Sequence, residues 1–169
     1  LLPPWRGAAT DGEPVPYTPC GLRRVFLDDL RSPFNVGAVF RTGAAYGVAE
    51  ILVSPESASP DHPRARRSGM GTVDLVPWHT TRIETLSSEG LFALESGGIE
   101  VDRFDFPESG TVIIGNEELG IEESARHTAR QAHGICSIPL PGPKASLNVS
   151  VAFGIVMQRW HAHAGGVGL

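Results

Sequence analysis

Polar side chains follow two apolar segments in the last third of the chain. Ser146 and Asn148 come after a Pro/Gly-rich loop, and that loop follows the apolar segment 134–138. Glu117 lies in a glycine-flanked turn directly after a second apolar segment, 111–114. Open α/β sheets bind their ligands outside the carboxyl ends of the strands. The spacing therefore predicts a ligand site where these two segments end.

The turn itself has glycines at both ends, Gly115 and Gly120. Glycine permits close backbone approach and positive φ, as a ligand cradle requires. A plain strand–helix turn with a capping acid would show the same pattern, so both interpretations stay open. Further upstream, Asn35 and Arg41 lie six residues apart at the start of an expected helix and could share one face. An Arg within an apolar helix stripe needs a partner, although a surface Arg is an equal alternative.

The elements that must position these residues alternate between strands and helices. The apolar segments predict strands at 23–27, 50–53, 71–78, 91–94, 111–114 and 134–138. Helical spacing predicts helices from Asn35 (as N-cap) to about 47, at 80–86, 121–130 and 146–163, with a possible turn at 63–67. Such alternation indicates an α/β fold with a parallel sheet and helices on both faces.

The length of 169 residues and the mass of 18.0 kDa predict one folded domain. Residues 1–20 are proline-rich and predict an extended tail or linker, which leaves 21–169 as the domain. We expect no membrane span, because no apolar run reaches about 20 residues. Cys20 and Cys136 are far apart in sequence, which favours a reducing cytoplasm. The six His residues show no metal-ligand spacing, so no metal is expected.

The net charge of −5 argues mildly against a nucleic-acid partner. The distribution of basic residues qualifies this, because seven of the 14 lie between Arg23 and Arg67 and all seven are Arg. Arg is the better bidentate ligand for phosphate. Charge alone therefore leaves RNA open as a partner.

Three sequence blocks together resemble the SpoU (TrmH-like) class of the SPOUT RNA ribose 2'-O-methyltransferases. The first runs from Ser32 to Thr42, the second from Ile114 to Gly120, and the third from Ile138 to Ala152. The resemblance covers about residues 22–163. It implies a parallel α/β domain with a C-terminal deep trefoil knot, S-adenosylmethionine bound in the knot, and a homodimer as the working unit.

The family's functional positions can be carried over to matching residues of this chain. The resemblance implies catalytic positions at Asn35, Arg41, Glu117, Ser146 and Asn148. It implies cofactor contacts at Leu94, Gly115, Asn116, Gly120, Ile138, Leu140, Ser146 and Leu147. RNA contacts are expected at Arg31, Arg41, Arg64, Arg66 and Arg67. Ala145 stands where the family often has an acid.

The resulting expectation is an S-adenosylmethionine-dependent RNA ribose 2'-O-methyltransferase that acts on tRNA or rRNA in the cytoplasm. Base methylation on the same fold is an alternative, and so is a cofactor-binding RNA-binding protein without catalysis. Arg41 can grip a phosphate, but an Arg pKa above about 12 makes it a costly base. A water molecule or the phosphate is an equally suitable proton acceptor.

Overall fold

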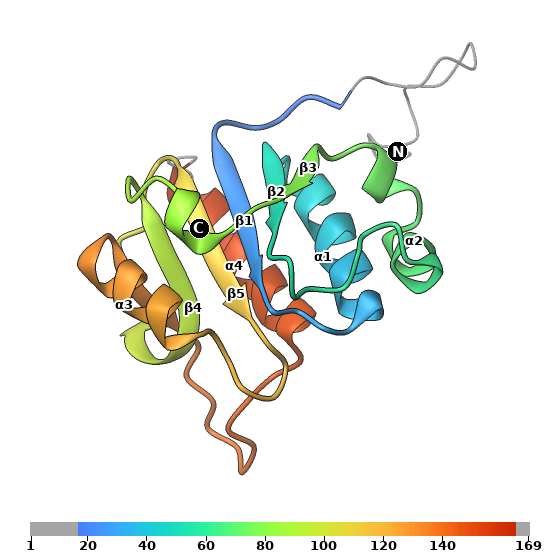
Figure 1. The fold of residues 1–169 in the computed structure, drawn as a ribbon. Coiled ribbons are helices and arrows are strands. Elements are labelled where there is room, and N and C mark those ends of the chain that lie inside the picture. Colours follow the sequence, from blue (N-terminus) through green and yellow to red (C-terminus); the bar gives the residue numbers. More distant parts are fainter. Residues whose placement is uncertain (1–16, 165–169) are drawn as a thin grey trace, which may run out of the picture.

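A six-stranded parallel sheet forms the centre of the molecule (Figure 1). The structure, a computed structural model, describes residues 17–164. The strands lie in the order β3-β2-β1-β5-β4-β6, and every neighbouring pair is parallel. Their bounds are β1 Arg23–Asp28, β2 Glu50–Val53, β3 Trp78–Thr80, β4 Leu91–Glu100, β5 Gly110–Gly115 and β6 Gly134–Ser137. The predicted parallel α/β architecture is confirmed.

Within residues 17–164, three α-helices and two 3₁₀ turns connect the strands, and a fourth α-helix, α4, follows β6. Their bounds are α1 Pro33–Ala45, α2 Pro63–Gly69, η2 Thr72–Asp74, η3 Ile83–Thr85, α3 Glu123–Gln131 and α4 Val149–Ala164. The cap of α1 is Ser32, whose side chain accepts from the Asn35 backbone N at 3.3 Å. The prediction of Asn35 as N-cap was therefore wrong by three residues. Pro33 occupies the first helical position, where its missing N–H costs nothing.

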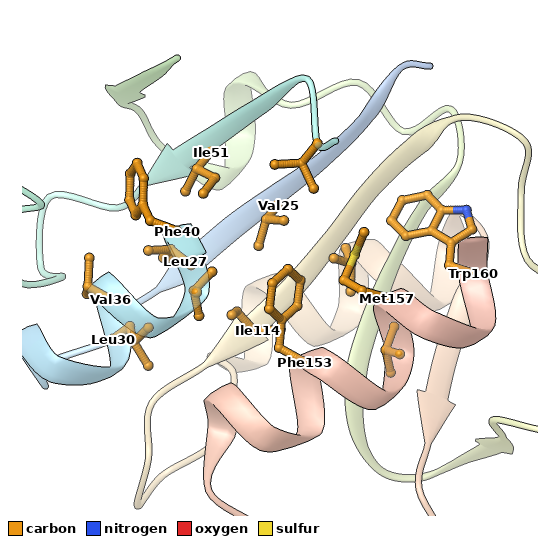
Figure 2. Packing of buried hydrophobic residues seen from close by; sticks show 14 of the residues in the cluster. Val25, Leu27, Leu30, Val36, Phe40, Ile51, Ile114, Phe153, Met157 and Trp160 are labelled. Atoms are coloured by element: carbon orange, nitrogen blue, oxygen red, sulfur yellow. The ribbon is translucent and has the colours of Figure 1, made fainter. Parts of the chain in front are cut away.

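Two apolar layers cover the two faces of the sheet, because successive strand residues point to opposite sides. Val25, Leu27 and Ile114 face the layer formed by α1 and α4. Phe153, Met157 and Trp160 of α4 point into this layer (Figure 2). On the other face, Phe26 and Ile113 belong to the layer that includes α3 and Ile83 of η3. Helices thus lie on both faces, as predicted.

The predicted strand at 71–78 was wrong over most of its length. Met70 and Gly71 have φ values of 50° and 86°, which breaks an extended path there. Val73 and Val76 lie three residues apart in a tight turn, and both side chains are buried there. Only Trp78–Thr80 pairs with β2. The helix predicted at 80–86 is likewise reduced to the single 3₁₀ turn of η3.

The ends of two later elements also differ from prediction. β4 continues to Glu100 instead of stopping at Leu94, through a register irregularity between Leu94 and Ile99 where the Gly97–Gly98 pair lies. α4 begins at Val149 instead of Ser146. The reason is Asn148, whose side-chain oxygen accepts from the Ser150 backbone N at 2.9 Å, the bond of an N-cap.

The predicted tail at 1–20 is described only from Tyr17 onward. Cys20 donates its backbone N–H to the Gly47 carbonyl at 2.8 Å, and Tyr17 packs against the α1/α4 layer. The remainder of that prediction lies outside the described residues. Within 17–164, no helix is both long and apolar enough to cross a membrane. The same range contains no group of three or more metal-ligating side chains suited to a metal ion.

Candidate active site

A hollow of about 380 Å³ lies at the carboxyl edge of the sheet. It is lined by residues 94–96 within β4, by the loop from β5 to α3, and by the long loop from β6 to α4. Figure 1 shows the two loops at the same end of the sheet. It is lined by every residue expected to contact a cofactor: Leu94, Gly115, Asn116, Gly120, Ile138, Leu140, Ser146 and Leu147. Segments far apart in sequence thus form one cavity, as ligand sites of parallel sheets do.

Gly115 and Gly120 are needed for the shape of the β5–α3 loop. A Cβ on Gly115 would lie 2.4 Å from the backbone N of Ile121, and Gly120 has a φ of 74°. Between them, the Asn116 side-chain oxygen accepts from the backbone N–H groups of Glu118 and Leu119 at 2.9 and 3.0 Å. The two glycines and these hydrogen bonds make the turn compact, so the loop that lines the hollow has a fixed backbone path.

The Asn116 side chain also anchors the loop to the end of β1. Its Nδ2 donates to the backbone oxygen and to the carboxylate of Asp29, both at 3.1 Å. Asp29 itself has a φ of 53°, unusual for a residue other than glycine. Asn116 therefore orders the wall of the hollow through bonds to protein groups.

Glu95 is a wall residue that the sequence patterns did not identify. Its Oε2 accepts from the Ile121 backbone N at 3.2 Å and pairs with Arg126 of α3 at 3.5 Å. A single carboxylate thus ties β4 to the loop and to the helix beyond it. The signal available in the sequence was its place directly after Leu94, where the predicted strand ended.

Three polar side chains form a directed chain of hydrogen bonds beside the hollow. Asn148 Nδ2 donates to Asn35 Oδ1 at 3.2 Å, and Asn35 Nδ2 donates to Glu117 Oε1 at 3.0 Å. Asn148 lies at the start of α4, Asn35 in the first turn of α1, and Glu117 in the β5–α3 loop. The structure therefore brings together three of the five residues expected to be catalytic.

Glu117 binds the amino end of α1. Its carboxylate also accepts from the backbone N–H groups of Ser32 at 2.9 Å and Arg31 at 3.3 Å. Partial burial opposes ionisation, but the hydrogen bonds from Asn35 and from backbone N–H groups outweigh it and lower the pKa of Glu117. The carboxyl is therefore an ionised anchor at neutral pH, and its oxygens are committed to these donors.

Ser146, the fourth expected residue, is exposed in the β6–α4 loop and lines the hollow. It forms no side-chain hydrogen bond with another residue of the described range. Ser150, which the sequence patterns did not identify, donates to Asn148 Oδ1 at 2.6 Å. Two donors thus hold the Asn148 oxygen, and this fixes its Nδ2 toward Asn35.

Arg41, the fifth expected residue, takes no part in the hydrogen bonds that link Asn148, Asn35 and Glu117. Asn35 is 5% exposed, whereas Arg41 is on the surface and has no hydrogen bond or ion pair with any residue in 17–164. Six helical positions place the two side chains about 120° apart around the axis and about 9 Å apart along it. The guanidinium is available for a partner outside the protomer.

The four other arginines expected to bind RNA fall into two pairs. Arg31 donates to both carboxylate oxygens of Asp29 at 2.9 and 3.0 Å. Arg66 is held between Asp61 and Asp74 at 2.6 and 2.9 Å. Arg64 and Arg67 are exposed, and their guanidinium groups pair with no side chain in the described part of the chain. Of these four arginines, only Arg64 and Arg67 are free to bind a phosphate.

Asp28 is a buried carboxylate at the carboxyl end of β1. Its Oδ2 accepts from the Glu122 backbone N at 2.7 Å, just before α3 begins. Burial raises its pKa, the Glu122 N–H acts in the opposite direction, and nearby Glu122, Asp29 and Glu56 raise it further. Asp28 thus joins the sheet to α3 at a cost in electrostatic free energy.

A larger hollow, of about 460 Å³, opens at the opposite edge of the sheet. Three of its charged or titratable lining groups pair with one another: Glu50 contacts His79 at 2.7 Å and Arg24 at 3.5 Å. None of the residues expected to be functional lines it. Size alone therefore does not make it the active site, and the chemistry favours the smaller hollow.

Comparison with known families agrees with this site. The model of the SpoU rRNA Methylase family matches residues 23–158, which include all three sequence blocks. The chain belongs to this family. The resemblance inferred from the blocks is thereby confirmed.

Relatives in the SpoU family include RNA-modifying enzymes. The chain is 29% identical over 142 residues to the 23S rRNA (guanosine-2'-O-)-methyltransferase RlmB of Xanthomonas axonopodis pv. citri, which covers 79% of this chain and 55% of that protein. It is also 29% identical to an uncharacterized tRNA/rRNA methyltransferase of Mycobacterium ulcerans, over 79% of this chain and 44% of the other. The chain spans about half the length of the curated relatives that it matches.

Two solved structures share the fold. The AdoMet-bound rRNA methyltransferase of Sinorhizobium meliloti superposes with a TM-score of 0.73 at 26% identity, over 88% of this chain and 59% of that one. A structure described for the 2-OH methylation of C/U34 on tRNA superposes with a TM-score of 0.76 at 26% identity, over 86% and 98%. The hollow thus occurs in a fold that these proteins have in common.

Proposed function

We propose that this SpoU-family chain transfers a methyl group from S-adenosylmethionine to a ribose 2'-hydroxyl of tRNA or rRNA. The observation that carries the proposal is the hydrogen-bonded chain of Glu117, Asn35 and Asn148, in which Glu117 lines the 380 Å³ hollow. It places fixed amide groups next to a cavity of cofactor size. Several relatives are named for RNA ribose methylation, which supports the reaction class.

The residues around the hollow fit S-adenosylmethionine. Leu94, Ile138, Leu140 and Leu147 offer apolar contact for an adenine ring, and backbone groups near them can bind its polar edge. Glu95, Glu117 and Glu118 make the hollow acidic, apart from Arg126, which already pairs with Glu95. An acidic lining suits a ligand with a cationic sulfonium and ammonium.

The bound cofactor would supply an activated methyl group. The protein must then align the ribose hydroxyl for in-line attack and let its proton leave. Asn35 and Asn148 are suited to orientation, since Glu117 fixes their direction. Glu117 is a positioning residue, because its pKa is lowered and its oxygens already accept three hydrogen bonds. Ser146 has a free hydroxyl at the hollow and is suited to contact the substrate directly.

We further propose a deep trefoil knot in the C-terminal part of the domain. The β5–α3 loop and the β6–α4 loop jointly line the hollow, which supports a chain path in which one passes through the other. We also propose that residues 21–169 form the methyltransferase domain and that 1–20 precede it as a linker. A cytoplasmic location is consistent with two free cysteines, Cys20 and Cys136.

A homodimer completes the proposal. α4 buries Phe153, Val156 and Met157 against its own sheet, while Val151 is 53% exposed and Ile155 is half-buried on another side. An apolar helix face with no cover in its own protomer is suited to a second copy. The exposed Arg41 would then serve the hollow of the partner. Light scattering at low micromolar concentration should give about twice 18.0 kDa, and Val151→Glu should lower this mass toward the monomer.

Methyl transfer can be tested with labelled S-adenosylmethionine and RNA from cells that lack the gene. A ribose 2'-O-methyl group blocks alkaline cleavage of the adjoining phosphodiester bond, whereas most base methylation does not. We expect label in RNA together with one alkali-resistant site. Label without alkali resistance would favour base methylation. Cofactor binding without transfer to any cellular RNA would contradict the proposed enzyme activity.

A further inference from the structure

An aromatic ring lies on the surface directly beside the amide chain. Phe34 precedes Asn35 in the first turn of α1 and is 61% exposed, while Asn35 is 5% exposed. The ring does not contribute to either apolar layer of the sheet. An exposed Phe next to a buried polar site has no role in the core, so its surroundings indicate what it binds.

Helix α2 is pressed against this turn. The Ser68 hydroxyl lies 2.9 Å from the Phe34 backbone oxygen and 3.0 Å from the Arg64 backbone oxygen. Gly37 allows this approach, because a Cβ there would lie within about 2 Å of the Ser68 hydroxyl and the Ala65 carbonyl. The packing fixes α2, and with it Arg64 and Arg67, next to Phe34.

The charges on α2 complement a phosphate backbone. Arg64 and Arg67 are free within the described residues, whereas Asp61 and Asp74 near them are neutralised by Arg66. An exposed ring and two free guanidinium groups, carried by a turn and a helix that pack against each other, have the composition of a platform for single-stranded RNA, on which a base stacks while phosphates meet cations. The hollow, by contrast, is lined by Glu95, Glu117 and Glu118, so the two surfaces suit different ligands.

The geometry points to Phe34 as a base-stacking residue that selects an unpaired nucleotide as substrate. This inference rests on the proposed ribose methylation. Phe34 is the chain neighbour of Asn35, so a nucleotide whose ribose is held at Asn35 and Asn148 lies near the residue that carries the ring. A base inside a duplex cannot stack on a side chain without leaving its neighbours. The substrate is then a nucleotide in a loop or a single strand.

The test compares Phe34→Ala and Phe34→Tyr with Leu22→Ala as the matched control. Leu22 is 60% exposed but precedes β1 at the opposite edge of the sheet. Removal of an exposed ring should leave the fold intact. The probe is a single-stranded RNA decamer of uridines, which stack weakly on one another, with one central 2-aminopurine, whose fluorescence is quenched by stacking. A ten-base-pair RNA duplex is the second probe.

We expect wild type, Leu22→Ala and Phe34→Tyr to quench the decamer with similar affinity and to bind the duplex more weakly. Phe34→Ala should lose the quench and bind the decamer about tenfold more weakly, since one stacked base is worth on the order of 1–3 kcal/mol. Equal binding and quench in Phe34→Ala and wild type would overturn the inference, as would a wild type without any quench.

Two further readouts separate the possible failures. If Phe34→Ala changes the sedimenting mass of the protein, the ring belongs to an interface between copies and the stacking role is wrong. If wild type methylates cellular RNA and Phe34→Ala does so with the same KM and kcat, stacking is wrong while the proposed function stands. If wild type transfers no methyl group to RNA, the proposed function itself fails.

Discussion

Asn148 donates its side-chain N–H to the side-chain oxygen of Asn35 at 3.2 Å, although 113 residues separate them. The bond joins the first turns of α4 and α1, the two helices that cover the same face of the sheet. The Asn148 oxygen is held by Ser150, and the Asn35 N–H by Glu117. Each amide therefore has one orientation, which is the preorganisation that a positioned ribose hydroxyl requires.

Loss of either amide should reduce methyl transfer more than cofactor affinity. We expect Asn35→Ala and Asn148→Ala each to lower kcat by about tenfold or more, because each removes a charge-assisted or buried hydrogen bond. Their effects should be non-additive in the double variant, since both act through one chain of bonds. Single-turnover transfer and calorimetric titration of S-adenosylmethionine measure the two properties.

Asn148→Ser is the matched control for the helix cap. Serine can accept from the Ser150 backbone N and preserve the start of α4, whereas alanine loses a cap worth about 1 kcal/mol. Neither side chain can donate to Asn35 in the same place. If Asn148→Ser transfers methyl groups at the wild-type rate, the amide has no role in the reaction and its bond to Asn35 is structural.

The stability contributed by Glu117 should depend on pH. Its pKa in the folded protein is lowered by hydrogen bonds from Asn35 and from the backbone. A lowered folded-state pKa adds stability above the unfolded value of about 4.3, and this stability is lost as the pH falls through the folded value. Glu117→Gln should therefore unfold at lower urea concentration than wild type at neutral pH, with the gap closing in acid. A gap that stays constant down to about pH 2 would contradict the ionised anchor.

The sequence predicted the sheet and the walls of the site better than it predicted the relations between side chains. Strand β2 matched residue for residue, because a buried parallel strand is a continuous apolar run with clear ends. The segment 71–78 did not, since Val73 and Val76 are buried from a tight turn that apolar content alone cannot distinguish from a strand. Local sequence patterns indicate which residues are buried, but they do not indicate which backbone path buries them.

The eight expected cofactor residues line one hollow because they lie in β4, at the end of β5, or in the loops that follow β5 and β6, so the topology of the parallel sheet gathers them. Arg41 was expected near Asn35, but the helical period already places residues six apart about a third of a turn from each other, so that expectation misapplied the period. No such rule applies to Glu95. Glu95 acts through a loop whose path depends on Gly120. Contacts that depend on a loop's tertiary path leave no periodic signal in sequence.

Gly115→Ala should impair cofactor binding by disturbing the β5–α3 loop. The added methyl group would lie 2.4 Å from the Ile121 backbone N, so the loop must move. Gly142→Ala is the matched control in the β6–α4 loop, because nothing lies within 4 Å of its would-be Cβ. We expect calorimetry to show at least about tenfold weaker binding of S-adenosylmethionine for Gly115→Ala only. Equal affinities of the two variants would show that the cofactor does not bind in this hollow.

Arg41 should act on RNA and leave cofactor affinity unchanged. It is exposed, unpaired within residues 17–164, and separate from the Asn35 chain. Arg41→Ala should lower kcat/KM for RNA by about 10- to 100-fold, the loss expected for a charged hydrogen bond. Arg41→Lys should also be poorly active, since a point charge does not replace the bidentate fork of a guanidinium.

In a mixed dimer of Arg41→Ala and Gly115→Ala chains, partial recovery of methyl transfer would show that Arg41 serves the partner's hollow. No recovery would show that Arg41 serves the hollow of its own chain.

Asp28 should weaken the fold at neutral pH and cease to do so in acid. Burial raises its pKa, so the folded protein binds a proton that the unfolded chain releases above about pH 3.9. Ionisation therefore costs stability above the folded pKa, and the cost disappears as the pH falls through that value.

Asp28→Asn keeps an oxygen for the Glu122 N–H and removes the charge, so it should raise the urea midpoint at neutral pH, with the gain shrinking toward pH 4. Asp28→Ala should instead destabilise by about 1–3 kcal/mol, because it leaves the Glu122 N–H unpaired. A midpoint for Asp28→Asn below that of wild type at every pH would mean that the bond to Glu122 outweighs the cost of burying the charge.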